Sequence, residues 1–181
     1  EAGADYEDVT IDLTKGDQRS PEFLKLNPKG RVPVLVTDKG VLTENVALLL
    51  FVAQIHRKAR LAPDDPFLLA KMNAFNSYLA STVHVAHAHS MRGSRWSDDV
   101  AAIESMKAKV AQNMTDCASI IENEYLEGPW VLGELFTVAD CYLHIIANWM
   151  PGDGVDMTKF PRISAHTAAM NQRPAVRKVM A

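Results

Sequence analysis

The stretch NPKGRVPVLVTDKGVLTEN, from Asn27 to Asn45, decides how the first part of this chain folds. Asn27-Pro28 predicts the end of a helix, because the proline ring biases the residue before it away from the helical conformation. Two short runs rich in Val and Thr follow, and the Asp-Lys-Gly turn between them predicts a β-hairpin. Glu44-Asn45 then opens an apolar helix. The stretch therefore predicts a helix, a proline loop, a hairpin and a second helix, in that order.

The residues on either side of this stretch extend the pattern. Apolar and polar residues alternate over residues 6–13, which predicts a strand. Ser20 is a predicted N-cap, because a proline follows it at the first position of a short helix over residues 21–26. The helix that opens at Glu44 is predicted to end near residue 57, and the proline-containing residues 58–66 read as a linker.

Beyond the linker, apolar residues recur at spacings of three and four, which predicts an all-helical part. Thr137 and Asp140 form a capping box at the start of one helix: Thr137 can accept a hydrogen bond from the Asp140 amide, and the Asp140 carboxylate can reach back. Such a box is a folding device, and it predicts no catalytic role. Helices are predicted over residues 67–89, 98–125, 137–150, 158–171 and 174–180.

Composition excludes several classes of protein. The chain has 181 residues, a net charge of −3 and a pI of about 6.1, and its Lys and Arg residues are scattered apart from a small C-terminal cluster. Neither a nucleic-acid surface nor a polybasic membrane surface is expected from this balance. No apolar run is long enough to span a bilayer. Two cysteines, Cys117 and Cys141, with no visible leader favour a reducing, cytoplasmic setting.

The order of these features resembles the glutathione-binding half of a glutathione transferase. The family carries an Asn-Pro-x-Gly-x-Val-Pro loop, a short hairpin and an acidic-polar pair at a helix start. The residues that stand in those places are Asn27, Pro28, Gly30, Val32, Pro33, Glu44 and Asn45. The segments GPWVLGELFTVADCYL and FPRISAHTAAMNQRPAVRKVM resemble the family's helical domain, and the best local matches are to bacterial members near the beta class.

The resemblance implies a thioredoxin-like α/β domain over residues 1–57 and an all-helical domain over residues 64–181. The family fold begins with a βα unit ahead of the strand predicted here, and this chain begins at Glu1 without a methionine. We therefore expect the N-terminal domain to be incomplete in this sequence. In the family, the Tyr, Ser or Cys that activates the thiol lies in that first unit, so the catalytic residue is not identified, and Cys117 and Cys141 lie in the wrong domain to replace it.

The resemblance also implies a glutathione site. A cis bond between Val32 and Pro33 would turn the main chain of Val32 outward, where a tripeptide can pair with it like an added strand. The start of the helix at Asn45 suits the γ-glutamyl carboxylate, because free N–H groups and the positive end of the helix dipole lie there, and Glu44 would bind the amino group. Lys15 or Gln18 would reach the glycyl carboxylate. The alternatives are an ordinary loop proline, a purely structural helix cap and solvated side chains. Asn45 also departs from the serine that most members carry.

The acceptor site is expected in the cleft between the domains. His84 is the candidate that faces glutathione or the acceptor, Arg92, Arg95 and Trp96 would shape the mouth, and Trp149 resembles a tryptophan near the acceptor in beta-class members. An equal alternative for His84 is a histidine that is hydrogen-bonded between two helices, and for Trp149 it is core packing. No metal is expected, because His84 and its neighbour three residues on lack a third ligand in the sequence.

As a function, the resemblance implies a glutathione transferase that conjugates or exchanges the thiol of its co-substrate glutathione with an electrophilic small molecule. A homodimer with a role in detoxification is the family expectation. The alternative is a non-catalytic binding or assembly module of the same fold, because a fold alone does not decide a function.

Overall fold

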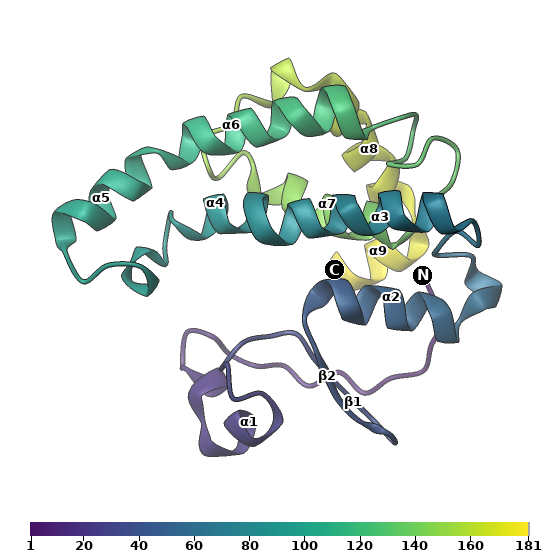
Figure 1. Ribbon diagram of the computed structural model, residues 1–181, viewed down its shortest axis with the longest axis horizontal. Helices are drawn as coiled ribbons and strands as arrows, with labels where there is room; N and C mark the ends of the chain where they lie inside the picture. The colour runs from purple at the N-terminus through teal and green to yellow at the C-terminus, as the bar shows by residue number, and fades with distance from the viewer. Residues whose placement is uncertain (181) are drawn as a thin grey trace.

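The computed structural model describes residues 1–180, which form a small α/β part followed by a larger helical part (Figure 1). The α/β part pairs two strands in one antiparallel hairpin, with Val34 opposite Thr43 and Thr37 opposite Gly40. Its elements are α1 (Pro21–Leu26), β1 (Val34–Thr37), β2 (Gly40–Thr43) and α2 (Asn45–Ile55). The helix, loop, hairpin and helix predicted from the sequence are therefore confirmed.

Local hydrogen bonds explain why these residues fold in this way. The Ser20 hydroxyl accepts from the Phe23 N–H at 3.2 Å and caps α1, as predicted. Buried Asn27 shapes the loop that follows: its side-chain NH₂ donates to the Arg31 carbonyl at 2.6 Å, and its side-chain oxygen accepts from the Lys29 N–H at 3.2 Å. The loop is thus held from inside by one amide side chain.

The strand predicted over residues 6–13 is wrong. These residues contain no strand, and they run as an open chain from the helical part toward α1 (Figure 1). Tyr6 is 70% exposed and Val9 is 68% exposed. An alternating segment becomes a strand only where a neighbour supplies the ladder of hydrogen bonds, and within residues 1–180 the sheet consists of β1 and β2 alone.

The helical part is built on long helices that are interrupted where the sequence predicts continuous ones. The segment predicted over residues 67–89 contains a π-helical turn, Leu79–Val83, and the segment predicted over residues 98–125 divides into two helices and a second π-helical turn, Ile121–Tyr125. The helices are α3 (Pro66–Tyr78), α4 (His84–Ala88), α5 (Val100–Ala108), α6 (Val110–Ile120), α7 (Val138–Trp149), α8 (Pro161–Gln172) and α9 (Pro174–Met180), and 3-10 turns cover Asp17–Arg19, Arg57–Ala59, Gly93–Arg95 and Met157–Lys159.

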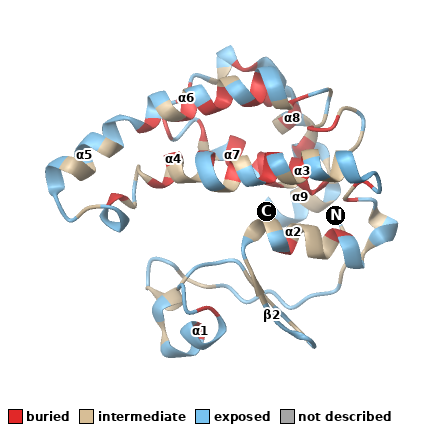
Figure 2. Ribbon diagram, viewed as in Figure 1, coloured by how far each residue is buried: buried red, intermediate tan, exposed pale blue. Residues whose placement is uncertain are grey.

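The core lies between α3, α6, α7 and α8, where buried residues gather, whereas α1 and α5 are mostly exposed (Figure 2). Phe75, Met114, Leu143 and Ile146 are fully enclosed there. Helix α7 is central because buried residues lie on most of its surface. Of the helices that residues 1–180 form, none combines the length and hydrophobicity needed to cross a bilayer.

The capping box at the start of α7 is confirmed, with one difference in detail. The Thr137 hydroxyl accepts from the Ala139 N–H at 3.2 Å, and the Asp140 N–H donates to the Thr137 carbonyl instead. The Asp140 carboxylate accepts from the Thr137 N–H at 2.8 Å and also from the Val131 N–H at 2.8 Å. The box therefore anchors the preceding loop as well as the helix, and this positions α7 beneath the cavity described next.

Candidate functional site

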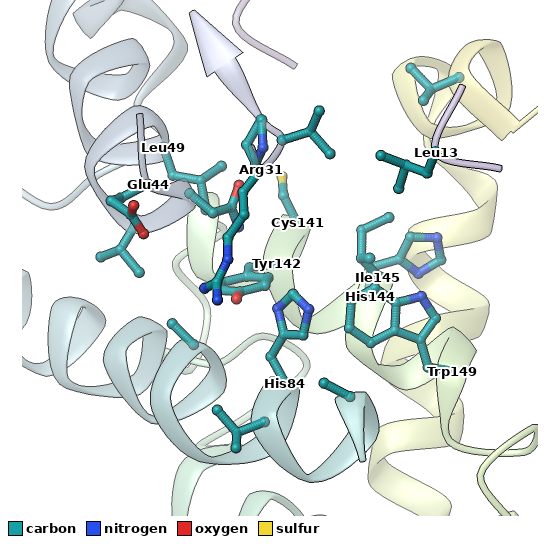
Figure 3. A pocket seen from close by; sticks show the side chains of 18 of the residues that line it. Leu13, Arg31, Glu44, Leu49, His84, Cys141, Tyr142, His144, Ile145 and Trp149 are labelled. Carbon is teal, nitrogen blue, oxygen red and sulfur yellow. The ribbon is translucent and has the colours of Figure 1, made fainter. Parts of the chain in front are cut away.

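A cavity of about 840 Å³ lies between the α/β part and the helical part (Figure 3). On one side it is lined by the loop ahead of β1 and by the start of α2, and on the other by α4, the 3-10 turn Gly93–Arg95, α7 and α9. The predicted site residues that line it are Gln18, Val32, Pro33, Glu44, Asn45, His84, Arg92, Arg95, Trp96 and Trp149. Residues from both ends of the sequence therefore meet in one space.

The Val32-Pro33 peptide bond is cis, as the sequence analysis predicted. Val32 is 43% exposed, and among residues 1–180 neither its N–H nor its carbonyl makes a hydrogen bond with the main chain. Because unpaired main-chain groups at the end of a strand can pair with an extended peptide, this position can add a short strand from a ligand.

The start of α2 lies at the same cavity, but Glu44 is not free. Its carboxylate forms an ion pair with the Lys29 ammonium, which also donates to the Thr43 hydroxyl at 2.8 Å. A ligand ammonium at Glu44 would therefore share this carboxylate with Lys29. Asn45 contacts Tyr142 of α7: burial raises the pKa of the Tyr142 phenol, and its hydrogen bond with Asn45 lowers the pKa in part.

Of the two side chains proposed for the glycyl carboxylate, only Gln18 reaches the cavity. Its buried side-chain oxygen has no hydrogen-bond partner within the described chain and can accept from a ligand N–H, whereas a carboxylate can only accept from the side-chain NH₂ group. Lys15 lies outside the cavity, where its ammonium is 3.1 Å from the Asp12 carboxylate. The loop after Asp12 folds back on itself, because that carboxylate also accepts from the Thr14 hydroxyl at 2.6 Å.

Three aromatic side chains stack along the helical wall. The Trp149 ring lies 5.0 Å from His84, edge to face, and 4.4 Å from His87, nearly parallel. His87 is held in turn by Asp153, whose Oδ2 is 2.7 Å from its Nδ1. Burial lowers the pKa of His84, and positive charge from His87, Arg92, Arg95 and Arg31 lowers it further. His84 is therefore a neutral imidazole near pH 7 and can donate or accept a hydrogen bond.

Among the cavity residues that the sequence did not identify as site residues are Arg31, Cys141, Tyr142 and His144. Arg31 lies in the proline loop, and its positive charge beside Val32 was the feature of the sequence that could have identified it. Its side chain extends toward Tyr142 and His84 (Figure 3). Burial lowers the pKa of His144, whose Nδ1 has no partner within residues 1–180. Burial raises the pKa of the Cys141 thiol to about 12, so it stays protonated.

The described residues at this cavity do not form a metal-binding site. In the part of the chain that the structure describes, residues 1–180, no three His, Cys, Asp or Glu side chains gather closely enough to hold a metal ion. The polar groups at the cavity include main-chain groups, amides, imidazoles and guanidinium groups, which suit an organic ligand with carboxylates, and its two carboxylates, Glu1 and Glu44, are paired with Arg173 and Lys29.

Comparison with known proteins agrees with this geometry. Residues 1–54 match the model of the glutathione S-transferase N-terminal domain, and residues 79–174 match that of the C-terminal domain. The chain is 26% identical to glutathione S-transferase GstA of Escherichia coli O157:H7 over 183 residues, which is 99% of this chain and 88% of the relative.

Two solved structures extend the match to three dimensions. A glutathione transferase homologue from Sulfitobacter, solved with bound glutathione, is 46% identical with a TM-score of 0.96, over 99% of this chain and 86% of that one. A sphingomonad glutathione S-transferase complexed with glutathione is 31% identical with a TM-score of 0.83, over 98% and 86%. The fold is therefore a thioredoxin-like part followed by an all-helical part, and the chain belongs to the glutathione S-transferase family.

Proposed function

We propose that this protein transfers glutathione to an electrophilic small molecule through the thiol sulfur, by conjugation or by thiol exchange. The observation that carries the proposal is the shared cavity, which brings the open main chain of Val32 and the start of α2 to face His84 and Trp149. Similar proteins have been solved with glutathione bound, which supports the same ligand here.

In this proposal, glutathione lies extended along the α/β side of the cavity. The Val32 main chain pairs with the cysteinyl residue of glutathione, and the N–H groups at the start of α2 bind the γ-glutamyl carboxylate together with the Asn45 amide. Glu44, shared with Lys29, binds the amino group. Gln18 lies toward the glycyl end. The thiol then points at the helical wall.

The acceptor would bind between the glutathione thiol and that wall. Trp96, Trp149 and Ile145 supply apolar surface there, and neutral His84 supplies a hydrogen bond. Such a wall fits a partly apolar electrophile, so a role in detoxification is part of the proposal. We also propose a cytoplasmic homodimer, on the family resemblance and the cysteine content.

Calorimetric titration of glutathione tests the binding half of the proposal. Asn45→Ala should weaken glutathione binding by about 10- to 100-fold, because a hydrogen bond to a charged group contributes roughly 1.5–3 kcal/mol. Lys15→Ala is the matched control and should leave the affinity within about twofold, because Lys15 lies outside the cavity. If Asn45→Ala and the unmodified protein bind glutathione with equal affinity, the Asn45 side chain at the start of α2 does not bind glutathione.

Turnover tests the chemical half. The protein should convert 1-chloro-2,4-dinitrobenzene if it conjugates glutathione, or 2-hydroxyethyl disulfide if it exchanges thiols. If the protein binds glutathione but converts neither substrate, it is a binding module and not a transferase for these reactions. Failure to bind glutathione at millimolar concentration would overturn the proposal as a whole.

A further inference from the structure

The cavity has more positively charged side chains than its acidic side chains neutralise. Three guanidinium groups line the cavity. Arg31 comes from the loop ahead of Pro33, Arg92 follows α4, and Arg95 ends the 3-10 turn Gly93–Arg95. Segments from both parts of the molecule thus bring cations to the same space.

In the part of the chain that the structure describes, none of these arginines has a carboxylate partner. Within residues 1–180, no Asp or Glu oxygen lies within 4.0 Å of Arg31, Arg92 or Arg95. The acidic residues that line the cavity are both already paired, Glu44 with Lys29 and Glu1 with Arg173 at 2.7 Å. Among residues 1–180, the cavity therefore contains three guanidinium groups that no carboxylate neutralises.

These cations act on one another. The pKa of Arg95 is lowered first by burial and then by the charges of Arg92, Arg31 and Arg19, although the group stays protonated. The charges of Arg92, Arg95 and Arg31 also contribute to lowering the pKa of His84, after burial and the charge of His87. An anion in the cavity would relieve this repulsion, and the planar fork of a guanidinium matches a carboxylate in particular.

Glutathione accounts for only part of this charge. In the binding mode proposed above, the γ-glutamyl carboxylate lies at the start of α2 and the glycyl end lies near Gln18. Arg31 comes from the loop beside Val32 on the glutathione side, and its side chain extends from there toward Tyr142 and His84 (Figure 3). Arg92 and Arg95 belong to the helical part and line the cavity together with Trp96, which is 47% exposed. They are left for the acceptor.

We propose that the preferred acceptor is an electrophile that carries a carboxylate, held by Arg92 and Arg95 while its apolar body lies against Trp96. The substrate class rests on the proposed function, but carboxylate binding does not require turnover. The test therefore measures binding directly, by quenching of tryptophan fluorescence with glutathione at saturation. The probes are 3,5-dinitrobenzoate and its neutral counterpart 1,3-dinitrobenzene.

The unmodified protein should bind 3,5-dinitrobenzoate at least about tenfold more tightly than 1,3-dinitrobenzene, because hydrogen bonds between charged partners are the strong ones. The double variant Arg92→Gln, Arg95→Gln should lose this preference and keep its affinity for the neutral probe within about twofold. Arg92→Lys, Arg95→Lys should retain a partial preference. The control Lys107→Gln, Lys109→Gln removes two exposed cations of α5 and its C-cap, outside the cavity, and should change neither affinity.

Two results would overturn the inference. One is equal affinity of the unmodified protein for both probes. The other is a loss of glutathione affinity in Arg92→Gln, Arg95→Gln as large as the loss for 3,5-dinitrobenzoate, which would assign these arginines to glutathione. Absence of turnover with any electrophile would count against the proposed reaction alone, since the binding preference is measured without it.

Discussion

Asp140→Ala should destabilise the protein far more than the loss of an ordinary helix cap. The Asp140 carboxylate is fully buried and serves four donors, one of which is the Thr137 hydroxyl at 3.4 Å from Oδ2. Oδ2 accepts from the Thr137 N–H at 2.8 Å, and Oδ1 accepts from the Val131 N–H at 2.8 Å and lies 3.2 Å from the His166 Nε2. Helix α7, its preceding loop and α8 therefore meet at one side chain.

The magnitude follows from the groups that would be left behind. Alanine leaves the N–H groups of Val131 and Thr137 and the ring of His166 without this acceptor, where water has no access. Each buried donor without a partner costs roughly 1–3 kcal/mol. Partial relaxation reduces the sum, so we expect a loss of about 3–5 kcal/mol, as for other broken buried charge networks. That is a large share of the roughly 5–15 kcal/mol that stabilises a typical domain.

Urea unfolding followed by far-UV circular dichroism measures this loss, with all variants at one protein concentration. The matched control is Asp99→Ala. Asp99 caps α5 through a single exposed hydrogen bond, in which its carboxylate accepts from the Ala101 N–H at 2.9 Å, and its loss should cost about 1 kcal/mol. If Asp140→Ala costs no more than Asp99→Ala, the buried carboxylate is not the anchor that we describe.

Two further predictions follow from buried titratable groups that line the cavity. Burial lowers the pKa of His84 in the folded protein, so the unfolded chain binds a proton at this residue first as the pH falls. The free energy of unfolding therefore keeps the contribution of neutral His84 above pH ~6.5 and loses it as the pH falls below that value. His84→Gln should therefore show a smaller drop in urea midpoint between pH 7.5 and 5.5 than the unmodified protein, and an equal drop would contradict this cause. Burial raises the pKa of the Cys141 thiol to about 12, so iodoacetamide at pH 8 should alkylate it more than ~10-fold more slowly than free cysteine, as peptide mass spectrometry would show. An equal rate would mean that the thiol is accessible and ionised.

Features that depend on near neighbours in the sequence could be predicted well. The Ser20 cap, the hairpin after Pro33 and the capping box before α7 each use groups within a few residues of one another, so local sequence contains their cause. The cis Val32-Pro33 bond was expected from the resemblance of the whole stretch to a known family, and the structure has it.

Predictions failed where a distant partner was needed. The alternation over residues 6–13 satisfied the pattern of a strand, but a strand forms only beside another strand, and the described chain offers no neighbour to these residues. The assignment of Lys15 or Gln18 to the glycyl carboxylate stays a prediction: Gln18 lines the cavity, and Lys15 lies outside it, beside its near neighbour Asp12.

The sequence by itself determined the order of the elements, their caps and the proline loop, because those features arise from interactions along a few residues of chain. The tertiary structure alone decided which side chains meet. Glu122 accepts from the N–H groups of Arg162 at 2.9 Å and Ile163 at 3.0 Å, forty residues away, and so caps α8. Arg31 joins Arg92 and Arg95 at one cavity in the same way. Such meetings follow from how helices pack on a shared core, and no local pattern encodes that packing.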